Sequence, residues 1–185
     1  MNVFVAGVHG VGKTYLASRL PVTLGLMHTS ASKLIKEERA MPNWGVDKRV
    51  SDVDGNQTAL AAAVQRHNAV GTRLLLDGHF VLLNSQEEFS LLGTEVFKSL
   101  NLDGVVLLEA DPNVIAMRIR ERDGRQAGID HLIEFITAER SQAQMVCVEL
   151  GISLIILKAP CPDTFVEAIL QLSGQTDGKS LAIEK

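Results

Sequence analysis

The sequence predicts an α/β fold with three layers, in which helices cover both faces of a doubly wound, five-stranded parallel sheet. Short apolar runs alternate with longer helical patterns to the end of the chain, as expected when helices connect parallel strands. Several runs are apolar almost throughout, which is typical of strands covered on both faces. The 185 residues, 46% of them hydrophobic, suit one domain with its own core.

Five apolar runs are the expected strands. In chain order they are residues 2–6, 26–29, 73–77, 104–109 and 153–157. Aromatic residues make up only 4% of the chain, so we expect a core built from Val, Leu, Ile and Ala.

Six helical patterns lie between these runs and after the last of them. They cover residues 13–20, 32–39, 57–70, 112–122, 129–150 and 162–172. Asp111 followed by Pro112 predicts a helix start, because an acidic cap and a proline in the first turn both favour one. Gly151 after Leu150 fits a helix stop.

We expect residues 1–173 to form the domain, although two polar segments fit the alternation poorly. Residues 41–54 carry Pro, Gly and the single Trp, and we expect them to form a mobile flap over a site. Residues 174–185 are polar at first and end in SLAIEK, which predicts a frayed tail or a short docked helix.

Charge and composition exclude several classes of function. The net charge of −4 argues against a whole-surface affinity for nucleic acid or anionic membranes. No apolar run approaches the ~20 residues that span a bilayer, and the first strand lacks the basic lead of a signal peptide. Cys147 and Cys161 match neither a zinc site nor a disulfide framework, so we expect two buried free thiols. These observations predict a cytoplasmic protein without nucleic-acid or membrane partners, and they leave homo-oligomerisation open.

The stretch GVHGVGKT, Gly7 to Thr14, predicts a phosphate-binding loop. It satisfies G-x-x-x-x-G-K-[ST] and stands between the first strand and the first helix, which is the context that the motif requires. Its glycines let successive backbone N–H groups point into one concavity. Lys13 can reach the β- and γ-phosphates, and Thr14 can offer its hydroxyl to Mg²⁺. The alternative is a glycine-rich turn that only tightens strand-to-helix packing, but both the motif and its context favour the phosphate loop. We therefore predict ATP and Mg²⁺ as cofactors, with the nucleotide bound by Gly7, His9, Gly10, Val11, Gly12, Lys13, Thr14 and Tyr15.

A second polar position lies in RLLLDGHF, where Asp77 ends an apolar strand. Ligands bind at the carboxyl edge of such sheets, so Asp77 could hold a water of the Mg²⁺ shell or orient an acceptor group. The alternative is a plain Asp-Gly turn. His79 could position a substrate, or it could be a packed, hydrogen-bonded residue.

Arginines gather in DPNVIAMRIRERDGRQAG. Arg118 and Arg122 stand four residues apart and share a helix face, and Arg140 follows on the next helix. Guanidinium groups match phosphate oxygens, so these three, with Lys13 and Asp77, are the predicted catalytic residues. The alternative is a solvated face on which Glu121 and Asp123 pair locally with the arginines.

Together these residues resemble the P-loop nucleoside monophosphate kinases, especially adenylate kinases of the compact archaeal type. GVHGVGKT resembles their phosphate loop, LLLDGHF their third-strand Asp-Gly motif, and HTSASKLIKEE their monophosphate-binding helix. The resemblance spans residues 2–172 and implies a P-loop NTP hydrolase fold, with a short lid at about 122–130 and an acceptor-side segment at about 28–70.

By this resemblance Lys36 takes the place of an arginine that grips the acceptor phosphate, and Ser30 takes a hydroxyl position. With His79, they are the predicted substrate-binding residues. Two departures concern the acceptor: DGHF lacks the arginine of the Phe-Pro-Arg continuation, and Lys36 cannot make the planar fork of an arginine.

The leading hypothesis is a kinase that transfers the γ-phosphoryl group of Mg-ATP to a nucleoside monophosphate such as AMP. One alternative keeps the fold but takes a metabolite or nucleoside as the acceptor. Shikimate-type kinases carry paired acids after the second strand and a glycine triplet near the third, and neither occurs here. Another alternative is an ATP-binding switch that hydrolyses slowly and reports nucleotide state to a partner.

Overall fold

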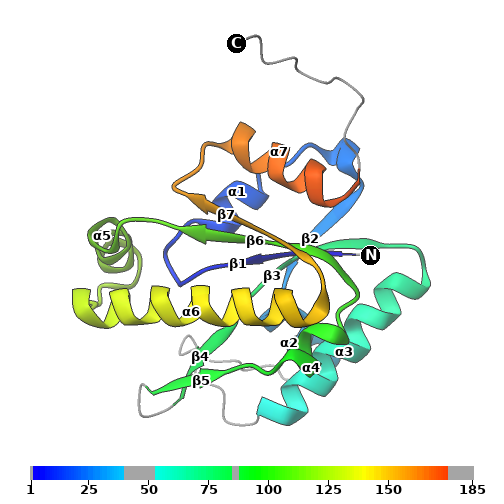
Figure 1. Cartoon of the computed structure of the whole chain (residues 1–185), viewed down its shortest axis with the longest axis horizontal. Coiled ribbons are helices and arrows are strands. Elements are labelled where there is room, and N and C mark those ends of the chain that lie inside the picture. The colour runs from blue at the N-terminus through cyan, green and yellow to red at the C-terminus, as the bar shows by residue number, and fades with distance from the viewer. Residues whose placement is uncertain (1, 40–52, 85–87, 175–185) are drawn as a thin grey trace.

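The computed structural model describes residues 2–39, 53–84 and 88–174, and its centre is a five-stranded parallel sheet. The strand order is β2-β3-β1-β6-β7, so β1 lies in the middle (Figure 1). The strands are β1 (Asn2–Ala6), β2 (Leu26–Ser30), β3 (Arg73–Asp77), β6 (Leu102–Glu109) and β7 (Ser153–Lys158). All five predicted strands are confirmed, two of them with identical bounds.

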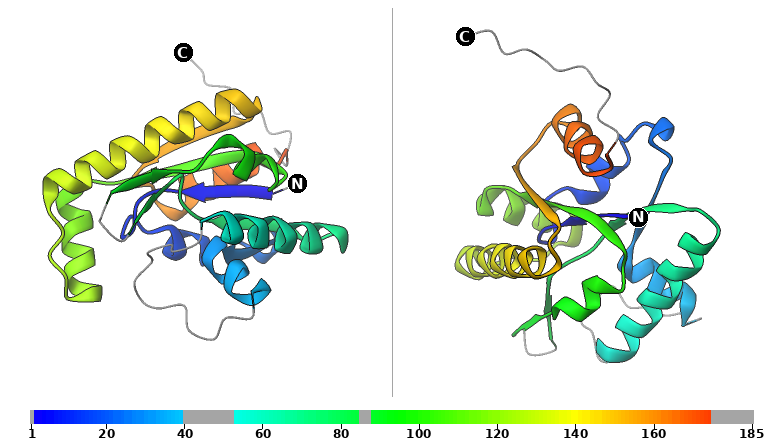
Figure 2. Two further views of the ribbon diagram at one scale, coloured as in Figure 1. Left: turned by 90° about the horizontal axis from the view of Figure 1, so that it is seen from below. Right: turned by 45° about the vertical axis from the view of Figure 1, so that its right-hand side comes forward.

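Helices cover both faces of the sheet, which confirms the doubly wound, three-layer prediction. Figures 1 and 2 show α1 and α7 on one side of the sheet, and α3 and α6 on the other. The helices are α1 (Lys13–Ala17), the 3₁₀ turn η1 (Val22–Leu24), α2 (Ala31–Glu38), α3 (Val53–Ala69), α4 (Thr94–Lys98), α5 (Pro112–Asp123), α6 (Ile129–Leu150) and α7 (Pro162–Leu172).

The predicted helix ends of α5 and α6 are confirmed. Asp111 caps α5, where its carboxylate accepts the N–H of Asn113 at 2.8 Å. Gly151 ends α6 with a φ of 65°, a left-handed conformation that glycine adopts readily. The first helix, in contrast, stops at Ala17 rather than at residue 20. The next residues continue with tighter bonds, from the N–H of Arg19 to Leu16 and from that of Leu20 to Ala17.

The sequence reading missed a small antiparallel hairpin and a short helix between β3 and β6. The hairpin pairs β4 (Val81–Leu83) with β5 (Phe89–Leu91), and α4 follows it. These elements have three to five residues each, which is too short for a clear periodic pattern.

The core is mostly aliphatic, as expected, but three phenylalanines meet in it. Phe80 stacks on Phe97 at 4.3 Å between ring centroids, and Phe4 contacts both edge to face at 5.4 and 5.5 Å. All three are fully buried. This cluster joins β1, the start of the hairpin and α4 into one wall.

The two cysteines differ from each other. Cys147 is a buried free thiol, as predicted, and burial raises its pKa to about 11. Cys161 is exposed, so the prediction for it was wrong. It precedes α7 in the loop after β7, where the chain faces solvent rather than the core.

Two predictions fall largely outside the described residues. Residues 41–52 of the expected flap and residues 175–185 of the expected tail are not described. In the described part of the chain, no helix combines the length and the apolar character needed to cross a membrane.

Candidate active site

The loop from Gly7 to Lys13 leaves β1 in the shape that a phosphate loop requires. Gly7 has a φ of 135°, and a Cβ there would lie 2.4 Å from the carbonyl oxygen of Leu108 in β6. Gly12 has a φ of 112°, which side chains larger than hydrogen disfavour. The backbone conformation at Gly7 and Gly12 therefore requires glycine.

Lys13 folds back into this loop. Its ammonium group donates hydrogen bonds to the carbonyl oxygens of Gly7 and, at 3.4 Å, of Val8. Only 8% of the residue is exposed. A buried cation is thus already in place at the loop, and burial makes its charge act strongly on an anion bound there.

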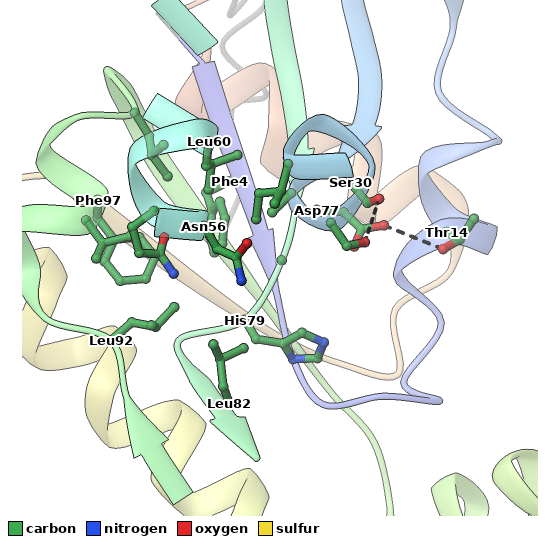
Figure 3. Close-up of a pocket in the computed structure, with 17 residues that line it drawn as sticks. Phe4, Thr14, Ser30, Asn56, Leu60, Asp77, His79, Leu82, Leu92 and Phe97 are labelled. Carbon is green, nitrogen blue, oxygen red and sulfur yellow. Dashed lines mark hydrogen bonds between the residues drawn. The ribbon is translucent and has the colours of Figure 1, made fainter. Parts of the chain in front are cut away.

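Thr14 near the start of α1, His28 in the middle of β2 and Asp77 at the end of β3 lie close together. Thr14 Oγ1 lies 3.5 Å from Asp77 Oδ2 (Figure 3). His28 Nε2 lies 3.3 Å from the same oxygen. Burial alone would raise the pKa of Asp77, but the hydrogen bond to His28 and the charge of Lys13 lower it below its ordinary value. Asp77 is therefore ionised at neutral pH.

A hydroxyl and an ionised carboxylate suit a bound Mg²⁺, because that ion prefers oxygen ligands and usually keeps several waters. Thr14 and Asp77 supply such a pair beside Lys13. No group of three or more His, Cys, Asp and Glu side chains suited to hold a metal by themselves occurs in the described ranges. One hydroxyl and one carboxylate would leave the other positions around Mg²⁺ to waters and phosphate oxygens.

Glu139 is a buried residue that the sequence reading missed. It lies on α6 with 1% of its surface exposed and accepts backbone N–H groups from Gly7 at 3.2 Å, Phe80 at 3.0 and 3.1 Å, and Val81 at 2.8 Å. One carboxylate therefore ties the first residue of the phosphate loop to the segment after β3. The sequence does contain a signal for this residue, because Glu139 is a charged side chain within the apolar face of α6.

His79 packs beside Glu139, with 3.7 Å between Nδ1 and Oε1, and its ring stacks on Phe135. It also lines the cavity described below. The structure thus combines both alternatives from the sequence: a packed histidine that borders the predicted substrate site.

The predicted nucleotide contacts differ in their surroundings. Val11 is buried, whereas Tyr15 is 57% exposed with Arg19 over its ring. His9 lies 3.5 Å from Asp123, the last residue of α5. This pair connects the phosphate loop to the start of the predicted lid.

The three predicted catalytic arginines separate in the structure. Arg118 donates to the carbonyl oxygens of Gly10 at 3.3 Å and Val11 at 3.1 Å, so it lies at the phosphate loop. Arg122 pairs with its neighbour Asp123 at 2.7 Å, as the solvated-face alternative has it. Arg140 forms a two-pronged pair with Glu109 at the end of β6.

This difference predicts that Arg118 contributes to nucleotide binding. We expect Arg118→Ala to raise the Kd for Mg-ATP about tenfold, which corresponds to about 1.4 kcal/mol, because a charge-assisted contact next to the phosphates is lost. Arg120→Ala is the matched control, since Arg120 is exposed on another face of α5. Isothermal titration calorimetry measures both variants. Equal affinities would contradict the assignment of Arg118.

On the acceptor side, Ser30 caps α2 by accepting the N–H of Lys33 at 3.1 Å. Lys36 is exposed and does not line the cavity. Arg39 lies one turn beyond Ile35, a residue that does line it, and donates to Asn56 Oδ1 at 2.9 Å. Arg39 thus contacts a residue of the cavity wall, while the role of Lys36 at an acceptor phosphate stays a prediction.

A cavity of about 210 Å³ opens next to Thr14 and Asp77 (Figure 3). Its polar lining comes mainly from α1, β2, α2, α3 and the end of β3, and its apolar lining includes the phenylalanine wall. The lining residues are Phe4, Thr14, Ser30, Ala31, Ser32, Ile35, Asn56, Gln57, Leu60, Asp77, Gly78, His79, Leu82, Leu92, Val96, Phe97 and Leu100. A small molecule held here would reach the hydroxyl and carboxylate at the phosphate loop.

Comparisons with known proteins identify a matching family model and several similar folds. A family model described as an AAA domain matches residues 6–136. The chain is similar to a shikimate kinase from Acinetobacter baumannii solved with shikimate, with 16% identity, a TM-score of 0.60 and 95% of each chain covered. A search of curated proteins found no significant match.

Two further solved structures are similar. One is a sugar kinase from Janibacter sp. HTCC2649, with 18% identity, a TM-score of 0.55 and 95% of each chain covered. The other is a gluconokinase from Sinorhizobium meliloti 1021, with 14% identity, a TM-score of 0.54, and coverage of 94% of this chain and 91% of that one. At these identities the likeness shows the fold, and it confirms the predicted α/β P-loop architecture.

Proposed function

The chain belongs to the AAA domain family that matches it, and on this premise we propose that it is an ATP-dependent kinase that phosphorylates a small molecule. The observation that carries the proposal is that Thr14 and Asp77, beside the buried Lys13 of the phosphate loop, line one end of a cavity. Such an arrangement places a phosphoryl donor and an acceptor side by side, which is most of what phosphoryl transfer requires of a protein.

Each residue has a role in this proposal. Bound Mg-ATP would supply the γ-phosphoryl group. Its bond to the β-phosphate oxygen would break, a bond to the acceptor oxygen would form, ADP would leave, and the hydroxyl proton of the acceptor would pass to solvent. Lys13 would neutralise charge on the phosphates, and Thr14 would hold the metal. Asp77, ionised and partly buried, would hold a metal-bound water or accept a hydrogen bond from the acceptor hydroxyl. Arg118 would contact the phosphates from α5.

A small metabolite is the acceptor that the geometry supports best. The similar structures are named as kinases of shikimate, sugar and gluconate, all small metabolites. The nucleoside monophosphate specificity implied by the sequence resemblance stays a prediction. The exposed position of Lys36, away from the cavity, does not favour it.

The role of Asp77 can be tested by an isosteric change. We expect Asp77→Asn to lower the rate of acceptor-dependent ADP release roughly 100-fold, because the amide carries no charge for the metal shell or the acceptor hydroxyl. Binding of ATP without Mg²⁺ should be unchanged or slightly tighter, since a negative charge near the phosphates is removed. Asp130→Asn is the matched control, because Asp130 is exposed on α6.

The function itself is tested by coupled ADP release with Mg-ATP and a panel of metabolites and nucleoside monophosphates. Acceptor-stimulated turnover by a metabolite is the expected result. Tight ATP binding without stimulation by any acceptor would instead favour the ATP-binding switch. Stimulation by AMP alone would restore the adenylate-type specificity.

A further inference from the structure

We propose that the acceptor is a compact, uncharged alcohol with a second oxygen function, and that the side-chain amide of Asn56 selects it. This inference rests on the proposed kinase function. It concerns the chemistry of the cavity beside Asp77, which the kinase proposal leaves open.

The first argument is the size of the cavity and its wall. Its volume of about 210 Å³ is below the roughly 300–1,000 Å³ typical of pockets for drug-sized ligands. Phe4, Leu60 and Phe97 form apolar lining at 4% exposure or less, and such a wall packs against hydrocarbon. The occupant is therefore small and has an apolar side.

The second argument is charge. Among the described lining residues, Asp77 is the one carboxylate, and neither lysine nor arginine lines the cavity. Asp77 repels a second phosphate group in the same cavity, and no lysine or arginine among the described lining residues offsets that repulsion. An uncharged acceptor meets no such repulsion.

The third argument is the orientation of Asn56, which is 3% exposed. Arg39 Nη1 lies 2.9 Å from Asn56 Oδ1. A guanidinium group only donates hydrogen bonds, so the amide oxygen must face Arg39. The NH₂ group of Asn56 is then the polar group left for the cavity, and no hydrogen bond of it occurs among the described residues.

The apolar wall, the Asn56 amide and the Asp77 carboxylate follow one another along the cavity, and this order indicates which groups a ligand must carry. Figure 3 shows Asn56 between the Phe97 end of the pocket and the Asp77 end. A ligand that fits would pack its hydrocarbon against Phe97, accept a hydrogen bond from Asn56 through an oxygen, and present a hydroxyl towards Asp77. Cyclic diols and polyols have this chemistry.

Asn56→Asp tests the amide with almost no change in shape. Both carboxylate oxygens accept hydrogen bonds, so Arg39 keeps a partner, while the donor to the ligand becomes an acceptor and repels the ligand oxygen. We expect the KM for the acceptor to rise tenfold or more and the KM for ATP to stay unchanged. Gln144→Glu is the matched control, since Gln144 is exposed on α6. Thermal unfolding of both variants identifies any loss of folding.

The acceptor class is tested by ADP release with glycerol, myo-inositol and cyclohexane-1,2-diol, together with the phosphate esters of the same compounds and AMP. Stimulation by an uncharged alcohol but not by its ester is the expected result. Stimulation only by esters or AMP would overturn the inference while leaving the kinase proposal intact, as would an Asn56→Asp variant with an unchanged acceptor KM and an unchanged melting temperature. Stimulation by none of the compounds would contradict the kinase proposal and this inference with it.

Discussion

Lys13→Ala is expected to abolish turnover, with acceptor-dependent ADP release falling by roughly 100-fold or more. The ammonium group is held inside the phosphate loop by the carbonyl oxygens of Gly7 and Val8. Its charge is thus in position before the nucleotide binds, so little reorganisation is needed when negative charge develops on the migrating group. No other described lysine contacts the loop in this way. The rate is measured by coupled ADP release at saturating Mg-ATP.

Two controls separate this effect from a loss of folding. Lys98→Ala removes an exposed lysine on α4, and we expect wild-type rates from it. The melting temperature of Lys13→Ala should fall by only a few degrees, because the variant loses hydrogen bonds to two carbonyl groups but no apolar core. Wild-type rates from Lys13→Ala would remove this residue from the mechanism.

The parts of the fold that could be predicted are those set by local sequence. An apolar run followed by G-x-x-x-x-G-K-T can form few structures, because its glycines permit a backbone path that other residues resist. The strand ending at Asp77 was predicted with its true bounds for a similar reason: an apolar run meets an Asp-Gly pair. In both places the signal lies within a few consecutive residues.

The roles of the basic residues could not be predicted in the same way. Arg118, Arg122 and Arg140 all suit phosphate binding, but the fold brings only Arg118 to the loop carbonyls, while Arg122 and Arg140 pair with Asp123 and Glu109. Which acid lies within reach of a long side chain depends on tertiary packing. Arg39 contacts Asn56 on α3 whereas Lys36 is exposed, which again depends on tertiary packing.

Glu139 illustrates a signal that was present but needed the structure for its meaning. The residue stands among Leu132, Phe135, Ala143 and Val146, at the spacing of one helix face. A carboxylate in such a stripe indicates either that the helix face is exposed at that position or that the carboxylate is buried with hydrogen-bond partners. Only the packing of α6 against the ends of β1 and β3 shows that the partners are backbone N–H groups.

The second large expected effect follows from this arrangement. We expect Glu139→Gln to lower the free energy of unfolding by about 3 kcal/mol, and the melting temperature by about 6–12 °C, because the amide NH₂ would face N–H donors that then lose their acceptor. Denaturant unfolding measures the free energy of unfolding of the wild type and the variant. Glu134→Gln, an exposed change on the same helix, is the matched control and should leave stability within about 0.5 kcal/mol.

The same carboxylate predicts a dependence of stability on pH. Burial would raise the pKa of Glu139, but the hydrogen bond and charge of His79, the N–H of Phe80 and the charge of Lys13 together lower it below its ordinary value of 4.5. A lowered pKa in the folded state means that the stabilisation is complete above about pH 4.5 and is lost as the pH falls below it. The Glu139→Gln variant has no carboxylate at this position, so it lacks this pH-dependent stabilisation.

The stability difference between wild type and Glu139→Gln should therefore shrink as the pH is lowered from about 7 to about 3.5. Asp77 also has a lowered pKa, but it is present in both proteins, so its contribution cancels in the difference. A difference that stays constant over this range would mean that Glu139 is not ionised in the folded protein. The carboxylate would then hold the phosphate loop as a neutral acid, with one oxygen acting as a donor, and its hydrogen bonds to Gly7 and Val81 would be weaker than an ionised group provides.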